Sequence, residues 1–411
     1  MNAFAAKDVW AESQGQGVTV AVVDSGVDAT HPDLTGQVLE GKDFTGGGDA
    51  RQDEMGHGTA MASLIAGHGH GPGNASGMVG LAPKSKILPL RTLQTEKDRN
   101  SDETWGAAVR YAVDQGAKVI NLSFASDSKT LSDGRAAIAY AQARDVVVVA
   151  GTGNDASIAV SEPAALPGVV AVGAIDKKGN RWEKSNTGKG LVLMAPGVEV
   201  LTANPTKSGK YNVSNGTSDS TAYVSAAAAL VRSKFPDLTA GQVINRLIKS
   251  ATFAHHKGLK APDEEYGYGI VRPYSALTMD IPAGPKTNPL GQLSSATPAS
   301  GGAAEEADDS TQAKKKKKKS SGSLLVLGGI GAVVVVGAIV FAVIRTRRNG
   351  GNGGPGNGGG TPPPGTGYPP QPPTGYQSHP NAVPNQGYPT PPGQSSQHPN
   401  PYSQQSPYQG Q

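Results

Sequence analysis

The chain has 411 residues, enough for one large domain and additional segments, and it contains no cysteine. That absence excludes a disulfide framework, a thiolate zinc site and a thiol nucleophile. The net charge is +4, but nine of the 37 basic residues stand in Lys314–Lys319 and at Arg345, Arg347 and Arg348. The other 28 face 33 acidic residues, so the rest of the chain is mildly acidic and we expect no nucleic-acid partner.

The first predicted element is a buried strand, Gly17–Asp24 (GVTVAVVD). An apolar run rich in β-branched residues is typical of a parallel strand covered on both faces. The strand places Asp24 at its carboxyl end, the edge where open α/β sheets carry their sites. Alone, a buried Asp in such a turn is more often a cap, because buried polar groups usually serve nearby hydrogen bonds.

A glycine-marked turn, Gly56-His57-Gly58, opens a small-residue helix predicted over Thr59–Ala66. A single histidine in this position is usually a satisfied polar group. The following stretch, Gly67–Val79, carries His68 and His70, but no carboxylate or cysteine stands beside them in the sequence. We therefore expect a solvated loop there and no metal site.

Strands and helices alternate along the middle of the chain. Strands that alternate with helices of 10–15 residues predict a parallel sheet with helices on both faces, and so an α/β fold. The predicted strands are Lys86–Leu93, Lys118–Phe124, Asp145–Gly151, Val169–Ala174 and Leu191–Ala195, and the predicted helices are Asp102–Gln115, Ser132–Arg144 and Thr239–Ala251.

The longest predicted helix is Thr217–Phe235, an Ala-rich run that ends before a proline. Ser218 lies on its first turn, where free backbone N–H groups and the helix dipole favour the negative charge that develops in acyl transfer. A serine in this place is by itself usually only an N-cap. However, Asp24, His57 and Ser218 each occupy a glycine-marked turn, and their order is one of the known orders of a serine-hydrolase triad.

These stretches resemble the subtilisin-like serine proteases over roughly residues 1–280. The resemblance implies a three-layer α/β fold and a peptidase domain that cleaves protein or peptide substrates without a cofactor. It also implies that Asp24 orients His57, which takes the proton of the nucleophile Ser218. The matching motifs are VAVVDSGVDATHPDL (20–34), GHGTAMASLIAG (56–67), VINLSF (119–124), PAALPGVVAVGA (163–174), MAPG (194–197) and NGTSDSTAYVSAAAAL (215–230).

The same resemblance assigns the remaining site residues. Asn154, in Thr152-Gly153-Asn154, matches the oxyanion-hole asparagine of the family. Two segments match those that line the first specificity pocket and hold the substrate as an added strand, namely Ser123, Phe124 and Ala125, and Gly151, Thr152 and Gly153.

The motif around Ser218 departs from the family at two positions. Asp219 stands where an apolar or small residue is usual, and Ala222 stands in place of a proline. A carboxylate suits a helix N-terminus but opposes a nearby oxyanion, so we expect slow or restricted activity.

The composition changes after residue 280. Residues 281–323 are rich in Pro, Gly, Ser and Ala and predict a flexible linker that ends in the lysine run. Residues 324–344 contain no charge and are long enough to cross a bilayer as one helix. Residues 345–411 repeat Gly, Pro, Gln and Tyr, and we expect this tail to be disordered.

A peptidase domain, a linker and one C-terminal span resemble the layout of the mycosins, membrane-anchored proteases of type VII secretion in actinobacteria. This implies an extracellular catalytic domain, a cytoplasmic tail and a secretion complex as partner. The charge rule points the other way, because six lysines precede the span and three arginines follow it, and no signal peptide is visible. Two alternatives are a mainly structural component of a secretion complex and a general degradative subtilase.

Overall fold

The computed structural model describes residues 4–95, 101–126, 128–254 and 256–293. Within these residues no helix is long and apolar enough to span a bilayer. The predicted span 324–344, the tail 345–411 and the linker after residue 293 lie outside the described part.

The centre of the domain is one parallel sheet of seven strands, as the sequence predicts. Asp24 ends the strand β1 (Thr19–Asp24) near the middle of this sheet, beside Arg91 of β5 (Lys86–Arg91). The buried apolar runs explain this arrangement, because strands covered on both faces need continuous apolar side chains. Across the sheet the order is β2 (Lys42–Asp43), β5 (Lys86–Arg91), β1 (Thr19–Asp24), β6 (Val119–Leu122), β7 (Val147–Gly151), β8 (Val170–Ile175) and β9 (Leu193–Pro196).

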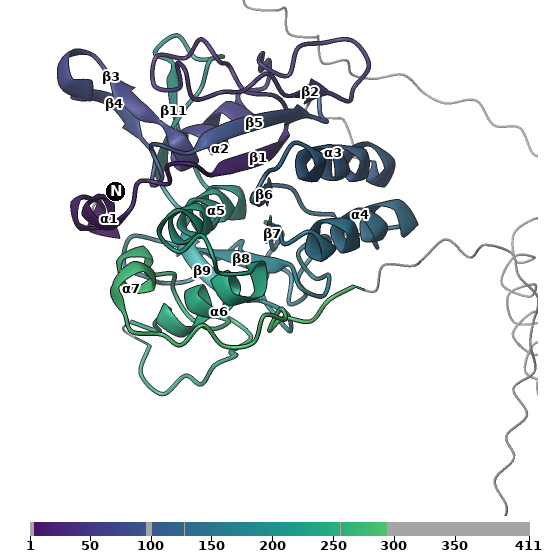
Figure 1. Ribbon diagram of the computed structural model, residues 1–411, viewed down its shortest axis with the longest axis vertical. Coiled ribbons are helices and arrows are strands. Elements are labelled where there is room, and N and C mark those ends of the chain that lie inside the picture. The colour runs from purple at the N-terminus through teal and green to yellow at the C-terminus, as the bar shows by residue number, and fades with distance from the viewer. Residues whose placement is uncertain (1–3, 96–100, 127, 255, 294–411) are drawn as a thin grey trace, which may run out of the picture. The chain divides into compact units, whose positions relative to one another are not determined.

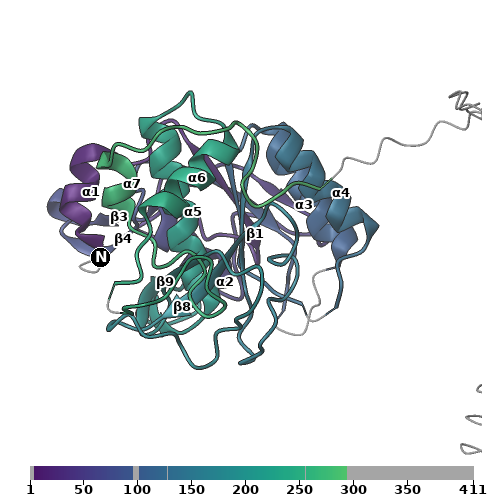
Figure 2. The ribbon, with the colours of Figure 1, turned by 90° about the horizontal axis from the view of Figure 1, so that it is seen from below.

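Helices cover both faces of the sheet, which confirms the predicted layering (Figure 1, Figure 2). On one face lie α3 (Asp102–Asp114) and α4 (Ser132–Ala143), which pack against each other. On the other face lie α2 (His57–Ala66) and α5 (Thr217–Lys234), which also contact each other. The site residues on β1, α2 and α5 are therefore brought to one side of the sheet.

The helix α5 runs through the core of the domain. Its residues from Ala226 to Val231 are at most 1% exposed, and it packs on β6, β7, β8 and β9. Alanine supports this position because it is the best helix former and lets the helix approach the strands closely. The first turn of α5 is thereby fixed against the sheet.

Two small hairpins stand beside the main sheet. The first joins β3 (His68–His70) to β4 (Ser76–Val79) through a 3₁₀ turn (Pro72–Asn74), where the sequence predicts a solvated loop. The prediction of a solvated stretch is confirmed for residues 71–77, which are exposed, but the flanking residues pair as strands. Nδ1 of His70 also lies 2.5 Å from the buried carboxylate of Asp33, which is distant in the sequence. The second hairpin joins β10 (Val200–Ala203) to β11 (Tyr211–Ser214).

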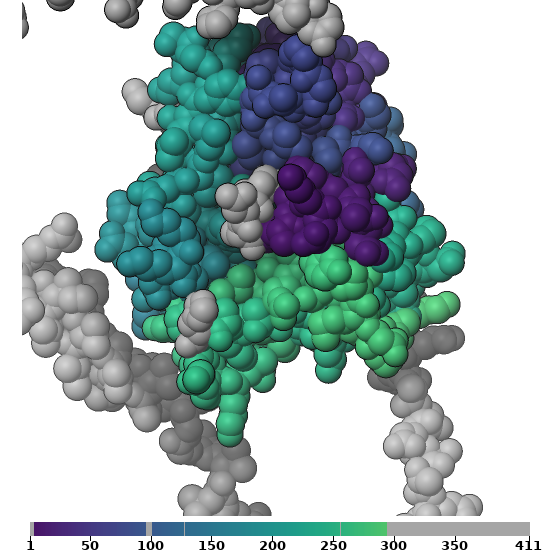
Figure 3. Space-filling view, turned by 90° about the vertical axis from the view of Figure 1, so that its left-hand side faces the viewer, coloured from purple at the N-terminus to yellow at the C-terminus, as the bar shows by residue number. Residues whose placement is uncertain are grey.

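The two ends of the described chain lie on the surface of the domain. The N-terminal helix α1 (Ala6–Glu12) contacts α7 (Pro273–Thr278), and Figure 3 shows these N-terminal residues against the C-terminal part. The helix α6 (Ala240–Ser250) begins with a capping box formed by Thr239 and Gln242. Residues 284–293 then lie along α6 and α4 through hydrogen bonds, although the sequence analysis assigns them to the linker.

Candidate active site

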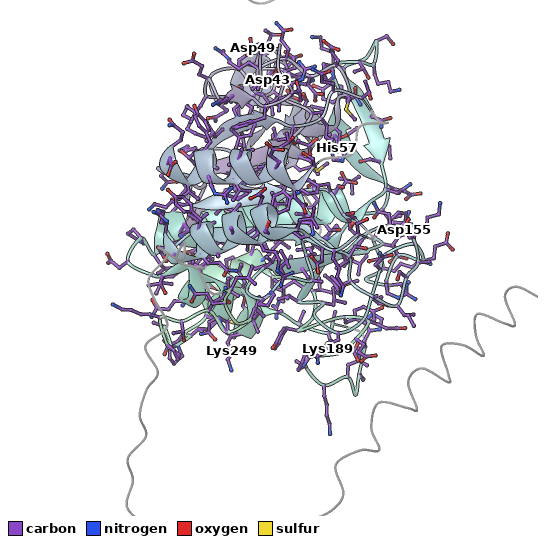
Figure 4. The ribbon with its side chains drawn as sticks, turned by 90° about the vertical axis from the view of Figure 1, so that its right-hand side faces the viewer. Asp43, Asp49, His57, Asp155, Lys189 and Lys249 are labelled. Carbon is purple, nitrogen blue, oxygen red and sulfur yellow. The ribbon has the colours of Figure 1, made fainter. Side chains whose placement is uncertain are left out.

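Asp24 and His57 form a hydrogen-bonded pair at the carboxyl edge of the sheet. Nδ1 of His57 lies 2.8 Å and 2.9 Å from the two carboxylate oxygens of Asp24. The carboxylate is buried, whereas the His57 side chain is 38% exposed. A carboxylate on Nδ1 fixes the ring so that Nε2 is left to accept a proton. Figure 4 shows His57 on the same side of the domain as Asp155, the neighbour of Asn154.

The start of α2 fixes the position of His57. Gly56 precedes the helix with φ of +83°, a left-handed conformation that favours glycine, and it provides no side-chain cap. Asp53 takes over that function, because its buried carboxylate accepts hydrogen bonds from the backbone of Met55, Gly56 and Thr59 and from the hydroxyls of Ser25 and Thr59. Asp53 thus ties the turn after β1 to the first turn of α2.

Ser218 lies on the first turn of α5, in the same cavity as His57. Its Oγ donates a hydrogen bond to the backbone carbonyl of Ser123, at 3.0 Å, rather than to His57. The Ser123 hydroxyl in turn donates to the Ser218 carbonyl, at 3.1 Å. Catalytic hydrogen bonds often tighten only with substrate bound, so we expect Ser218 to turn to His57 in the substrate complex.

Asn154 follows β7 and faces the same turn. Its Oδ1 accepts hydrogen bonds from the backbone N–H and the hydroxyl of Thr217, both at 2.9 Å. Because those groups need an acceptor, the amide nitrogen Nδ2 must be on the other side. A Cβ atom at Gly216 would lie 3.8 Å from Asn154 Nδ2 and 3.6 Å from Ser218 N, so both donors border the space in front of Gly216.

Two cavities flank this group of residues. The first, of about 760 Å³, is lined by His57, Asn154, Ser218 and Asp219, together with polar residues of the β10–β11 hairpin. The second, of about 600 Å³, is lined by Phe124 and Ala125 with Trp105 beneath. Phe124 follows Ser123, whose carbonyl accepts the hydrogen bond of Ser218, so the second cavity lies next to the segment that Ser218 contacts.

The two predicted substrate segments differ in their free polar groups. No backbone hydrogen bond joins Phe124 or Ala125 to another described residue, so this edge is open to an added strand. Thr152, in contrast, is fully buried, with its N–H donating to Val172 and its carbonyl accepting from Ser161. Gly151 and Gly153 flank it, and Gly153 has φ of +107°. The backbone groups of Thr152 are therefore not free to pair with a substrate strand.

The charges around His57 favour its protonated form. Burial by itself would lower the pKa of His57, but the charge and hydrogen bond of Asp24, followed by the charges of Asp219 and Asp53, raise it to about 9. Burial also raises the pKa of Asp219 to about 7, against the hydrogen bond from Ser214 and the charge of His57, which lower it. The site thus holds three carboxylates that raise the pKa of one imidazole, of which Asp24 has the largest effect.

The profile of the Subtilase family matches residues 15–269. The chain belongs to the subtilase family. A thermophilic serine proteinase of Bacillus sp. (strain AK1) is 36% identical over 274 residues, which are 66% of this chain and 64% of that protein. The subtilisins and proteinases among the relatives show that this subtilase is of the serine protease class.

Solved structures of mycosins are similar to this subtilase. MycP1 from Mycobacterium smegmatis is 30% identical with a TM-score of 0.60, covering 70% of this chain and 86% of that one. MycP3 from the type VII (ESX-3) secretion system is 33% identical with a TM-score of 0.54, covering 68% and 87%. The solved mycosin structures therefore share the fold of this subtilase.

Some residues of the subtilase site are not predicted by its motifs. Asp53 has one local signal, because an acidic residue shortly before a glycine and a helix start often caps that helix. The carbonyl of Ser123 has no such signal because its partner Ser218 is distant in the sequence, and the contact of Ser214 with Asp219 depends on the conformation of the short turn between β11 and α5. Only the folded arrangement identifies them.

Proposed function

We propose that this subtilase is a membrane-anchored serine endopeptidase that uses Asp24, His57 and Ser218 and passes through an acyl-enzyme. The single observation that carries the proposal is the Asp24–His57 hydrogen bond at the cavity that Ser218 also lines. A nucleophile, a base and a carboxylate that orients the base are the parts that acyl transfer needs.

In the proposed mechanism Ser218 Oγ attacks the peptide carbonyl and gives its proton to His57 Nε2. Asp24 holds the ring through Nδ1 and stabilises the imidazolium. Asn154 Nδ2 and the Ser218 backbone N–H donate to the oxyanion. In subtilisin, removal of one oxyanion-hole donor lowers kcat about 10²–10³-fold. His57 then protonates the leaving amine, and water releases the acyl group by the reverse sequence.

The likeness to MycP1 and MycP3 supports a place in type VII secretion. The titles of those structures assign them to type VII secretion systems. By analogy, we propose that this subtilase processes exported proteins beside such a complex, anchored by residues 324–344, with its catalytic domain outside the cell. A mainly structural role in the complex, or general degradation, is the alternative that experiment decides.

An acylating fluorophosphonate probe tests the catalytic proposal. We expect the wild-type protein to be labelled and Ser218→Ala to lose at least about 99% of the labelling, because the probe reacts only with an activated serine. The matched control is Ser132→Ala, since Ser132 is an exposed serine on the first turn of α4. Labelling should remain unchanged in that variant.

The outcomes separate the alternatives. Labelling that survives in Ser218→Ala removes the assigned nucleophile. A wild-type protein that is folded by circular dichroism but not labelled favours the structural role. Labelling combined with cleavage of unrelated denatured proteins at high rate favours general degradation.

A further inference from the structure

Asp219 occupies an unusual place beside the nucleophile. It is the third residue of α5, directly after Ser218, and it is 1% exposed. An acidic residue at this position often caps the N–H of the residue before the helix. Here that N–H belongs to Gly216 and already donates to the carbonyl of Gly197. Asp219 is therefore not explained by helix capping.

The carboxylate of Asp219 has a single hydrogen-bond donor among the described residues. That donor is the hydroxyl of Ser214, which lies 3.0 Å and 2.9 Å from the two oxygens. A hydroxyl has only one hydrogen, whereas an ionised carboxylate can accept about four hydrogen bonds. Asp219 is thus a buried carboxylate with most of its acceptor capacity unused.

The charges that face Asp219 do not neutralise it through direct contact. No Lys or Arg forms an ion pair with it in the described part of the chain. The titratable groups around it are His57 on α2 and Tyr223 one turn later on α5, with Glu54 and Lys207 also lining the cavity and Asp24 and Asp53 behind His57. Among these, His57 is the group whose charge changes during the reaction.

We propose that Asp219 is a positioning residue that acts on His57, its negative charge holding the imidazole in the protonated, inactive form until the medium becomes alkaline. This rests on the proposed catalytic function of His57. The base must be neutral to take the proton of Ser218, so a second carboxylate near the ring moves the active range to higher pH. Asp24 alone supplies the orientation of the ring, and Asp219 sets the pH at which the base becomes available.

The direction of the pKa values agrees with this geometry. Asp219 contributes to raising the pKa of His57 to about 9, and His57 contributes to lowering the pKa of Asp219 against burial. The two groups therefore stabilise each other's charged forms. Removing the charge of Asp219 should therefore lower the pKa of His57 toward its ordinary value, whereas removing the charge of His57 should raise the pKa of Asp219 further.

The test is the pH dependence of kcat/KM for a small acyl ester, because this quantity reports the pKa of the free enzyme's base. We expect Asp219→Asn to move the acidic-side inflection of this pH profile to a lower pH by about one unit, because removing a nearby negative charge lowers the pKa of the base. The variant is then severalfold faster than wild type between the pKa of Asp219 and that of His57, where the wild-type carboxylate is charged, and its advantage disappears at strongly alkaline pH. Ser214→Ala, which removes the donor that stabilises the anion, should shift the inflection in the same direction by less.

The matched control is Asp133→Asn, because Asp133 is an exposed acidic residue on the first turn of α4. It should leave the inflection unchanged. The proposal is overturned if the inflection stays within about 0.3 pH unit of the wild-type value in both Asp219→Asn and Ser214→Ala.

A second readout does not depend on turnover. NMR titration of the His57 ring in the Ser218→Ala background should show a lower imidazole pKa once Asp219→Asn is added. An unchanged His57 pKa contradicts the inference. If the wild-type protein shows neither ester hydrolysis nor fluorophosphonate labelling, the proposed function fails, whereas turnover with an unmoved inflection refutes the role of Asp219 alone.

Discussion

Asp53 shows how a residue outside the proposed triad can determine the geometry of the site. Five hydrogen bonds converge on its buried carboxylate from the turn after β1 and from the start of α2. Burial raises the pKa of Asp53, against the hydrogen bonds from Thr59, Gly56 and Ser25, which lower it. The same group therefore links the segment that carries Asp24 to the segment that carries His57.

We predict that Asp53→Ala destabilises the domain by roughly 3 kcal/mol, because each buried donor left without a partner costs about 1–3 kcal/mol and some will find water. We also expect kcat/KM to fall at least about tenfold, since His57 loses the support of its turn. Urea unfolding and ester hydrolysis measure the two effects. Asp133→Ala, at an exposed site, should change neither. A loss of activity with unchanged stability would show that Asp53 acts electrostatically instead.

Some residues of the site can be predicted from sequence motifs, and others cannot. Asp24, His57 and Ser218 each stand in a glycine-marked turn, and the structure brings Asp24 and His57 within hydrogen-bond distance. The contact of Ser218 with the Ser123 carbonyl depends on a side-chain rotamer, which no motif specifies. The role of Asp219 depends on which donors surround it, and Ser214 reaches it through the conformation of the short turn between β11 and α5.

At the scale of elements, long periodic segments are predictable and short non-local ones are not. The strands β1, β5, β6 and β7 and the helices α3, α4, α5 and α6 fall within or beside their predicted ranges, because apolar runs and helical spacing are local signals. The hairpins β3–β4 and β10–β11 have only three or four residues per strand, and their partners decide their structure. The strap, which we define as residues 281–293, likewise has a linker-like composition but is held by hydrogen bonds.

Arg246 on α6 fixes the start of the strap. Its guanidinium donates to the backbone carbonyls of Ala276, Met279 and Ile281, and it also stacks on the ring of Phe235. Further along, Gln242 donates to the carbonyl of Gly284, and the Gly168 N–H donates to the carbonyl of Leu290. The hydrogen bonds of the strap thus contribute to the stability of the peptidase domain.

We predict that Arg246→Ala lowers the free energy of unfolding by roughly 2–4 kcal/mol, since hydrogen bonds from a charged donor are worth about 1.5–3 kcal/mol each and are partly replaced by water. Arg246→Lys should recover only part of this loss, because an ammonium cannot reproduce the planar fork. Lys249→Ala, at an exposed position of the same helix that Figure 4 labels, is the control. Equal stability of Arg246→Ala and Lys249→Ala would refute the anchoring role.

At the scale of the whole molecule, the peptidase domain and the segments after residue 293 differ in sequence character. The domain folds around a large apolar core, with Val20 to Val23 fully buried in the central strand. Residues 324–344 carry no charge, and the basic residues stand on either side of them. If this segment crosses a membrane as proposed, its direction depends on export rather than on the packing of the domain.

The last prediction concerns that direction. Six lysines before residues 324–344 favour a cytoplasmic domain, because basic residues are costly to translocate. Export that begins before the segment is reached would override this preference, and the segment would then stop transfer with Arg345, Arg347 and Arg348 inside. We expect protease added to intact cells to digest an epitope inserted after residue 300 and to spare one near residue 405.

The first epitope is placed after residue 300, and not within the strap, because a tag at Leu290 would break its hydrogen bond with Gly168. Permeabilised cells provide the control, since both epitopes must then be digested if both sites are accessible to the protease. The reverse pattern in intact cells, with residue 405 digested and residue 300 protected, would mean an inward-facing domain. An inward-facing domain cannot process proteins after export, so the secretion-linked function would fail while the subtilase chemistry of Ser218 could still be tested by the probe.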